Sequence, residues 1–393
     1  MAFLEDRWED PERKGKGRQW RVRYSDPDGR ERSRSFHRKT DATRFRSTVE
    51  ADLLRGTYLN PDAGKVLLRT YAAQWLDSRS VDVTSRRTIA ARIDGHILPA
   101  LGDRRLDQLS RSPSVIAAWV KGLPVAAGYA RDILSTLSAI FAAAVDDGMV
   151  ARNPCRAGSV KAPRPVKRRL VPWTGDQVAA VRDALPARFA AMTDCGAGLG
   201  LRQGEIFGLA LDAVPFLRRK VIVQLQVRLV GGRPVFAPPK GGREREVPLP
   251  GDVGRALSAH METFPPQAVT LPWRTPDGPP RTALLLFTAQ RGGAINRGYF
   301  DSKVWRPSCL AAGIPGGPGN GMHALRHYYA SALLAGGVDI KRVQESLGHH
   351  SAAFTLDVYG HLMPDSEGRA LRAIEAALSG GTVPEPSRIE KDQ

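Results

Sequence analysis

The sequence has few cysteines and no long apolar run. Its three cysteines, Cys155, Cys195 and Cys309, lie far apart among 393 residues and form no CxxC pair, so neither a disulfide framework nor a zinc site is indicated. No apolar run reaches the roughly 18 residues of a membrane-spanning helix, and the N-terminal segment has no signal-like apolar core. We therefore expect a cytoplasmic protein with no membrane partner, in which the cysteines are ordinary small apolar residues.

Acidic residues are too few to balance the basic ones. The chain has 40 Asp and Glu against 58 Lys and Arg, which gives a formal net charge of +18. Such an excess indicates a polyanionic partner, and nucleic acid is the leading candidate. Arginine outnumbers lysine by 46 to 12. This suits bidentate contacts with phosphate, although a GC-rich genome explains the bias equally well.

The basic residues are densest near the N-terminus, where residues 13–46 hold 13 Lys or Arg and 4 Asp or Glu. The segments "WRVRY" and "RERSRSF", separated by the turn "SDPDG", predict two basic strands. Phe45, Val49 and Leu53 predict a helix that packs on them. We expect residues 1–60 to be a DNA-contacting module, and a solvated basic hairpin is the alternative. The expected DNA contacts are Arg18, Arg21, Arg23, Arg32 and Arg34.

A helical block and a linker follow the basic module. Apolar residues at spacings of three or four, such as Ile89, Ile93 and Ile97, predict a bundle of about four helices over residues 66–155. Residues 156–172 are rich in proline, with six positive and no negative charges, which is typical of a linker that lies along DNA. The expected DNA contacts of this linker are Arg164, Lys167, Arg168 and Arg169.

The third and largest region spans residues 173–380, and a polar tail follows over 381–393. It begins with a candidate capping box, Thr174 with Gln177. Residues 173–380 contain no D-x-D and no H-E-x-x-H pattern, so no metal is expected. Glycines 196, 198 and 200 resemble a nucleotide fingerprint only loosely, because no strand precedes them and the P-loop Lys-Ser/Thr is missing. We expect no cofactor.

Two segments of this region supply candidate phosphate ligands. Arg202 and Glu205 lie three residues apart at the start of a predicted helix, so the carboxylate can hold the guanidinium. Short predicted strands follow, with turns at Gly231-Gly232 and Gly241-Gly242, and Lys240 falls at the tip of the second hairpin. A lysine at such a tip is usually only solvated. It gains a role if the hairpin leans over a phosphate, where an ammonium can protonate a leaving oxygen.

Two further segments add imidazoles, a guanidinium and a phenol. His323 and Arg326 share one helix face in "HALRHYY", a pattern that is expected once by chance in such a chain. His349 follows the predicted helix stop at Gly348, and Tyr359 comes ten residues later. Together with Arg202, these residues form a combination that suits a phosphodiester. Two arginines can clamp its oxygens, and a tyrosine can attack it covalently without a metal.

The motifs together resemble the tyrosine recombinases of the phage integrase family. "GLRQGEIFGL" matches the first arginine motif, "PPKGGREREVPL" the lysine motif, "HALRHYYAS" the H-x-x-R box and "LGHHSAAFTLDVYGH" the box that ends in the nucleophile. The resemblance covers nearly all of residues 15–375. It implies a multidomain α+β fold with three parts: a small β-sheet-plus-helix arm-type DNA-binding module, an all-α core-site-binding bundle, and a mainly α catalytic domain with a small antiparallel sheet.

The resemblance also implies a role for each candidate residue. Tyr359 would attack the scissile phosphate to form a 3'-phosphotyrosyl link and release a 5'-hydroxyl. Arg202 and Arg326 would hold the phosphate, and Lys240 would protonate the leaving 5' oxygen. Two imidazoles would hydrogen-bond the phosphate and assist proton transfer, and one carboxylate would support the site without moving a proton. These residues are His323, His349 and Glu205. His350 and His361 are expected to be exposed neighbours.

The implied function is site-specific integration, and probable excision, of a phage or mobile element at double-stranded DNA attachment sites. The implied partners are three further protomers in a synaptic homotetramer, an excisionase and a host DNA-bending protein, and the implied location is the bacterial nucleoid. A resolvase or transposon recombinase with the same chemistry is the alternative, and an inactive DNA-binding regulator is a remote one. Leu371, Ile374 and Leu378 lie on one face of a predicted terminal helix. The resemblance implies that this helix docks on a neighbouring protomer, and self-packing is the alternative.

Overall fold

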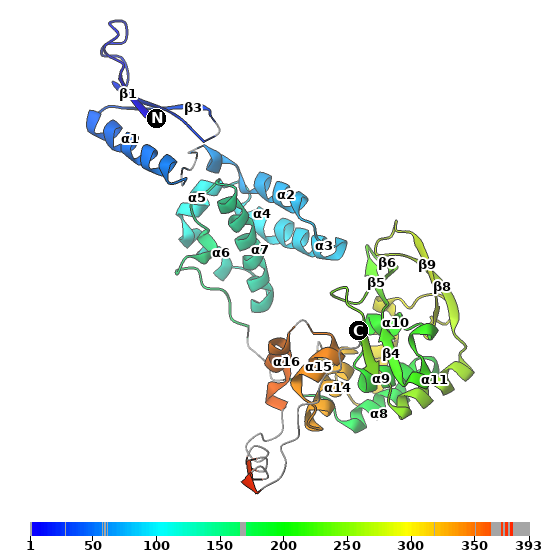
Figure 1. Cartoon of the computed structure of the whole chain (residues 1–393). Coiled ribbons are helices and arrows are strands. Elements are labelled where there is room, and N and C mark those ends of the chain that lie inside the picture. The colour runs from blue at the N-terminus through cyan, green and yellow to red at the C-terminus, as the bar shows by residue number, and fades with distance from the viewer. Residues whose placement is uncertain are drawn as a thin grey trace, which may run out of the picture. The chain divides into compact units, whose positions relative to one another are not determined.

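The computed structural model describes residues 2–27, 29–56, 58, 60, 62–165, 170–317, 319–349, 351–362, 371, 374, 375, 378 and 379. The chain divides into two compact units, Met1–Lys167 and Arg168–Gln393 (Figure 1). All sheets formed by the described residues are small and antiparallel. The expected α+β class is therefore confirmed. No helix among these residues is long and apolar enough to cross a membrane.

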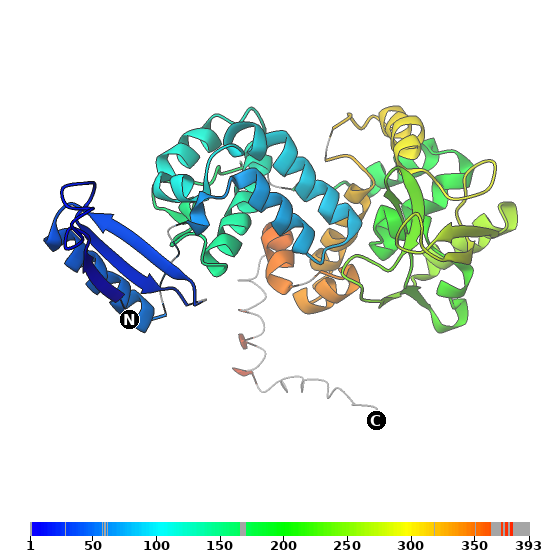
Figure 2. The ribbon, with the colours of Figure 1, turned by 90° about the horizontal axis from the view of Figure 1, so that it is seen from above.

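The first unit begins with a three-stranded sheet covered by one helix. The strands run in the order β1-β2-β3, and α1 contacts all three of them, on one face of the sheet (Figure 2). Val22, Tyr24, Ala42 and Val49 are buried between sheet and helix, as the alternation in "WRVRY" predicts. The bounds are β1 Ala2–Asp6, β2 Trp20–Ser25, β3 Glu31–Phe36 and α1 Lys39–Leu54. The sequence analysis missed β1.

The rest of the first unit is a helical bundle. Its core includes Leu68, Ile97, Leu106, Leu137 and Phe141, all fully buried. Three of its elements, α3, η2 and α4, form one continuous helical run. The bounds are α2 Leu68–Ser78, α3 Val83–Arg92, η2 Ile93–Ile97, α4 Leu98–Leu101, α5 Leu106–Arg111, α6 Pro113–Lys121 and α7 Ala127–Asp146.

The second unit is mainly helical. Its central helix, α9, contacts α8, α11 and α14, and its core includes the buried Leu199, Phe207, Phe287, Trp305 and Leu325. The bounds are α8 Gly175–Ala184, α9 Ala187–Leu199, α10 Gln203–Phe207, α11 Gly251–Thr263, α12 Arg297–Tyr299, η6 Phe300–Trp305, α13 Arg306–Ala311, α14 His323–Ala335, α15 Ile340–Leu347 and α16 Ala352–Tyr359. The predicted capping box is present at the start of α8.

Three two-stranded sheets lie at the edges of this helical core. β5 pairs with β6 through the predicted turn at Gly231-Gly232, β4 pairs with β7, and β8 pairs with β9. The bounds are β4 Lys220–Val223, β5 Gln226–Val230, β6 Arg233–Ala237, β7 Arg245–Pro248, β8 Gln267–Pro272 and β9 Pro280–Leu285. Single 3-10 turns complete the described chain: η1 Ala63–Lys65, η3 Pro154–Arg156, η4 Leu211–Ala213, η5 Phe216–Arg218 and η7 Gly360–Leu362.

The expected hairpin around Lys240 is wrong in one respect. A tight turn is present, because Gly242 N–H donates to the Pro239 carbonyl at 2.9 Å and both Gly241 and Gly242 have positive φ. The strands on either side do not pair with each other, however, since β6 pairs with β5 and β7 pairs with β4. Lys240 therefore lies on a connection between two sheets. Local turn chemistry was readable from the sequence, but strand partnership was not.

Candidate active site

Arg202 is held at the junction of α9 and α10. Helix α9 ends at Gly200 in the left-handed conformation, with φ of 63°, and Arg202 is the N-cap residue of α10. Glu205 accepts hydrogen bonds from the Arg202 backbone N–H at 2.9 Å and from its Nη1 at 3.0 Å. Nη2 donates to the Gly348 carbonyl at 3.2 Å. The expected pairing of this arginine with this carboxylate is present.

Glu205 is also bound by a second arginine that the sequence analysis did not single out. Arg245 donates from Nη1 to Oε1 at 2.9 Å and from Nη2 to Oε2 at 2.6 Å, and the Glu205 side chain is fully buried. Burial alone would raise the pKa of Glu205, but Arg245 and Arg202 outweigh it and lower the pKa to about 2. The carboxylate therefore stays ionised at neutral pH and positions the arginines without moving a proton.

The sequence contains a signal for Arg245. On β7 it shares a face with the buried Val247, while Glu246 between them is exposed. An arginine in phase with the apolar residues of a strand indicates a buried charge, which requires a paired partner. Its Nε also donates to the Ser346 carbonyl at 2.9 Å, so Arg245 connects β7, the start of α10 and the end of α15.

Arg326 is completely buried on α14. Its Nη1 donates to the Gly200 carbonyl at 2.6 Å and its Nη2 donates to the Leu347 carbonyl. Burial and the neighbouring charge of Arg202 lower the pKa of Arg326 to about 9, which leaves it charged at neutral pH. Its Nε is buried and has no hydrogen-bond partner among the described residues.

Tyr359 is the last residue of α16 and is 1% exposed. Burial raises the pKa of its phenol to about 12, against the lowering effect of Arg326 and Arg202. Its oxygen lies 2.7 Å from Nδ1 of His327. Helix α15 contacts both α14, which carries His327, and α16, which carries Tyr359. The three helices lie together in the orange part of the ribbon in Figure 1.

Two histidines on α14 lie one helical turn apart. The rings of His323 and His327 are 4.6 Å apart at 79°. Burial, and then the charge of Arg326, lowers the pKa of His327 to about 4. The pKa of His323 is also lowered, by desolvation and by His327, Arg326 and Arg202, although its exposed ring lets water moderate the effect. The sequence analysis selected His323 and missed His327, which follows the H-x-x-R pattern directly.

His349 lies where α15 ends. Gly348 stops the helix in the left-handed conformation, with φ of 61°, as the sequence predicts. The backbone of His349 is held by Gln344, whose carbonyl accepts from its N–H at 3.1 Å and whose side-chain Nε2 donates to its carbonyl at 2.6 Å. The ring Nδ1 is 2.9 Å from the hydroxyl of Thr355, and the ring lies parallel to that of Tyr359 at 6.4 Å.

The structure thus brings together five of the six predicted catalytic residues and leaves one apart. Lys240 is exposed on its turn, and none of the hydrogen bonds or ion pairs between described residues connects it to the others. Of the two neighbouring histidines, His361 is exposed with Nε2 2.9 Å from the Leu170 carbonyl, and His350 lies outside the described residues. The described residues contain no group of His, Cys, Asp and Glu that could hold a metal ion.

The predicted DNA-contacting arginines of the N-terminal sheet do not share one face. Arg21 pairs with Ser35 and Arg23 with Ser33, in register with each other on the face away from α1. On the helix face, Arg34 lies 5.0 Å from the Phe45 ring. Arg32 on that face pairs with the buried Asp26 at 3.1 Å. Arg18 is exposed and donates to the Ser35 carbonyl at 3.1 Å.

Of the predicted DNA contacts in the linker, Arg164 is exposed, whereas Lys167, Arg168 and Arg169 lie outside the described residues.

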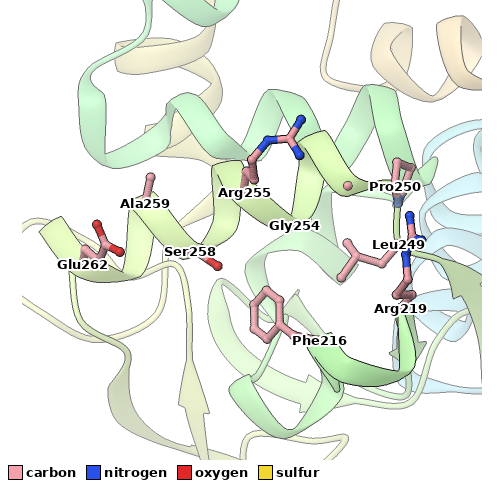
Figure 3. A pocket seen from close by; sticks show the side chains of 10 residues that line it. Phe216, Arg219, Leu249, Pro250, Gly254, Arg255, Ser258, Ala259 and Glu262 are labelled. Carbon is pink, nitrogen blue, oxygen red and sulfur yellow. The ribbon is translucent and has the colours of Figure 1, made fainter.

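A separate open pocket lies in the second unit between η5 and α11 (Figure 3). Its lining mixes apolar side chains such as Phe216 and Leu249 with the charged Arg219, Arg255 and Glu262. It shares no residue with the cluster around Tyr359.

Comparisons with known proteins point to one family. The sequence profile of the phage integrase family matches residues 175–365. The chain is 26% identical to a putative prophage phiRv2 integrase of Mycobacterium tuberculosis over 92% of each protein. It is 31% identical to the tyrosine recombinase XerC of Mycobacterium leprae over 66% of this chain and 81% of that protein. It spans 63% of a XerC-like recombinase of Caldanaerobacter subterraneus at 25% identity.

A structural comparison shows that the chain shares the fold of a solved integrase. The Tn1549 transposon integrase, solved in complex with a circular intermediate DNA, superposes with a TM-score of 0.66 at 19% sequence identity, over 79% of this chain and 99% of that one. The fold together with the family profile and these relatives defines a site-specific recombinase that cleaves and rejoins DNA. The chain belongs to the tyrosine recombinases of the phage integrase family.

Proposed function

We propose that the chain is an integrase in which Tyr359 is the nucleophile. Its phenol oxygen attacks the scissile phosphate at an attachment site, forms a 3'-phosphotyrosyl link and releases a 5'-hydroxyl. Exchange of strands and reversal of this step then integrate or excise a mobile element. The observation that carries the proposal is the convergence of two guanidiniums and three imidazoles around a buried phenol, with one carboxylate already neutralised by arginines.

Arg202 and Arg326 hold the phosphate in this proposal. Both guanidiniums are anchored through Nη atoms to the carbonyls of Gly348, Gly200 and Leu347, so they are oriented before DNA arrives. Preoriented donors stabilise the charge of a five-coordinate transition state better than flexible ones. Glu205 keeps the first guanidinium in place.

Proton transfer and phosphate contacts involve the remaining site residues. Lys240 acts as the acid that protonates the leaving 5' oxygen, and its exposed position on the Pro239–Gly242 turn leaves it free to move onto bound DNA. His323 and His349 donate hydrogen bonds to the phosphate. Because the phosphodiester energy stays in the phosphotyrosyl bond, the reaction needs neither ATP nor a metal.

The proposed division of the chain follows from its parts. Residues 1–60 bind arm-type sites, 66–155 bind the core site, 156–172 form a basic linker and 173–380 carry the chemistry. The sheet module favours integration over resolution, since it supplies a second DNA-binding surface. If deleting residues 1–60 leaves integration at the attachment site undiminished, the arm-binding proposal is wrong.

The proposed assembly is a homotetramer on two DNA duplexes in the bacterial nucleoid, assisted by an excisionase and a host DNA-bending protein. The apolar side chains of Leu371, Ile374 and Leu378 are 59%, 58% and 82% exposed, which supports docking on a neighbouring protomer over self-packing. Truncation after Asp365 is then expected to impair synapsis more than half-site binding. Equal loss of both would contradict the docking role.

A suicide substrate tests the chemistry. A duplex nicked near the crossover loses the short 5'-hydroxyl strand after cleavage, so the covalent protein–DNA adduct accumulates. We expect the adduct in the presence of EDTA for the wild type and none for Tyr359→Phe, with half-site binding unchanged in that variant. Adduct formation by Tyr359→Phe would refute the assignment of the nucleophile. For Lys240→Ala, a 5'-bridging phosphorothiolate substrate, whose leaving group needs no acid, is expected to restore cleavage.

A further inference from the structure

We propose that His327 is the base of the reaction: it accepts the phenolic proton of Tyr359 during cleavage and returns it during rejoining. This inference rests on the proposed function of Tyr359 as nucleophile. His327 lies within the quoted motif "HALRHYYAS", but it is not one of the six residues to which the sequence analysis gave a catalytic role. The geometry alone points to it.

The first support is direct contact with the reacting atom. Nδ1 of His327 lies 2.7 Å from the Tyr359 oxygen, within the range of about 2.6–3.2 Å expected between a base and the atom whose proton it abstracts. The two rings are 5.6 Å apart and inclined at 59°, so the imidazole approaches the phenol oxygen with its nitrogen edge. The contact joins the first half of α14 to the end of α16.

The second support is that the neighbouring imidazoles are engaged elsewhere. The ring of His349 lies parallel to the Tyr359 ring at 6.4 Å, and its Nδ1 is 2.9 Å from the Thr355 hydroxyl. His323 contacts the edge of His327 at 4.6 Å between ring centroids. His323 is the more exposed of the two α14 histidines, which suits a group that contacts DNA. His327 is half-buried behind it, at the phenol.

The charges around His327 keep it in the form that accepts a proton. It faces Arg326 and His323 on its own helix and Tyr359 on α16. The charge of Arg202 also lowers the pKa of His323 and of Tyr359. Burial and Arg326 lower the pKa of His327 to about 4, so at neutral pH the ring is neutral. In the tautomer that the proposal requires, Nδ1 accepts a hydrogen bond from the phenol. The phenol pKa of about 12 keeps the proton on oxygen until a bound phosphate, being anionic, favours an imidazolium beside it.

The step balances in atoms and charge. As the Tyr359 oxygen forms its bond to phosphorus, its proton moves to Nδ1 of His327, which becomes an imidazolium. The bond from phosphorus to the 5' oxygen breaks, and that oxygen takes the proton of the proposed acid, Lys240. In rejoining, the 5'-hydroxyl returns its proton to the lysine amine and attacks phosphorus. The tyrosine then leaves and recovers its proton from His327.

The test is single-turnover cleavage of the nicked suicide substrate by full-length protein across pH. His327→Gln keeps a polar side chain that can contact the phenol but cannot take up its proton. We expect adduct formation to slow by about 10²- to 10⁴-fold, the usual contribution of a general base, with half-site binding unchanged. The acid limb of the wild-type pH–rate profile is expected to disappear in this variant. His361→Gln removes an exposed imidazole whose ring nitrogen lies 2.9 Å from the Leu170 carbonyl. It is the control and is expected to keep both rate and profile.

Two further measurements separate a base from a structural residue. His327→Ala is expected to regain part of its rate with added imidazole, since a free base can then occupy the space. The 5'-bridging phosphorothiolate is expected to restore Lys240→Ala but not His327→Gln, because it bypasses the acid only. Cleavage by His327→Gln within about threefold of the wild type, a retained acid limb, or rescue by the phosphorothiolate would each overturn the proposal. Failure of the wild type to form any adduct would instead overturn the proposed function.

Discussion

Arginines in two regions of this molecule are held in opposite ways. In the cluster around Tyr359, Arg326 is fully buried and the Arg202 side chain is 22% exposed, and each guanidinium donates two hydrogen bonds to carbonyls or to a carboxylate. On the free face of the N-terminal sheet, the Arg23 side chain is 50% exposed and forms one ion pair, with Glu31. In the proposed function, the first arrangement fixes donors for one phosphate, whereas the second offers exposed charge to a DNA backbone.

The difference has an energetic meaning. A buried guanidinium is costly unless it is hydrogen-bonded, so the Tyr359 cluster can hold two only because carbonyls and Glu205 surround them. An exposed ion pair contributes little, about 0 to 1 kcal/mol, and a DNA phosphate replaces it easily. Substitutions in the two regions should therefore change different quantities.

The largest effect is expected for Arg326→Ala. The substitution leaves two buried carbonyls without donors and removes a phosphate ligand. We expect a loss of about 2–4 kcal/mol of stability and of about 10³-fold or more in cleavage rate. Arg326→Lys is the matched variant, since one ammonium cannot reproduce the two-sided contact. Chemical denaturation and adduct formation measure the two losses. Wild-type cleavage by Arg326→Lys would contradict the role given to the planar guanidinium of Arg326.

A smaller effect is expected for Arg245→Ala, which touches no DNA in the proposed mechanism. It leaves Glu205 with one arginine, and we expect about 1–3 kcal/mol lower stability and roughly tenfold slower cleavage through misplacement of Arg202. Lys220→Ala on the neighbouring strand removes the exposed Lys220–Glu246 pair and is expected to change stability by less than about 0.5 kcal/mol. Equal losses of stability in Arg245→Ala and Lys220→Ala would show that burial of the Arg245–Glu205 pair is unimportant.

The Arg245 variant also has a pH signature. The folded pKa of Glu205 is lowered from 4.5 to about 2. Its contribution to stability is therefore present above the unfolded pKa of about 4.5 and is lost as pH falls toward 2. With one arginine removed, the folded pKa is less depressed, and the variant gains less stability than the wild type as pH rises from 2 to 5. Parallel acid-unfolding curves for the two proteins would contradict this account.

The smallest effect is expected in the N-terminal sheet. The double substitution Arg21→Ala with Arg23→Ala is expected to weaken arm-site binding about tenfold at moderate salt and to reduce its salt dependence, because each phosphate contact releases counterions. Cleavage of an isolated core site should not change. Arg34→Ala, on the helix face, is expected to lower the stability of the module by about 0.5–1 kcal/mol through the lost contact with Phe45, without weakening binding. The reverse pattern would assign DNA to the helix face.

Local features were the ones that the sequence predicted well. The capping box at Thr174, the helix stop at Gly348 and the pairing of Arg202 with Glu205 each depend on residues at most three apart. The family motifs then selected residues that meet only in the fold, because the resemblance carries information about tertiary contacts. Periodicity by itself could not have predicted that Tyr359 contacts α14.

The features that were missed depend on partners distant in the chain. β1 was missed because "AFLED" is short and becomes a strand by pairing with β2. The Lys240 hairpin was wrong because β6 and β7 each find another partner. Arg245 reaches a carboxylate 40 residues away and His327 a phenol 32 residues away. No spacing rule for a helix or strand connects such pairs.

The identity of the residue joined to DNA tests the central claim most directly. The adduct trapped on the nicked substrate can be digested with protease and nuclease, and the peptide that keeps a nucleotide can be sequenced by mass spectrometry. The account predicts one modified peptide, with the nucleotide linked through its 3'-phosphate to Tyr359. A link to any other residue, or a 5'-phosphate link, would contradict it.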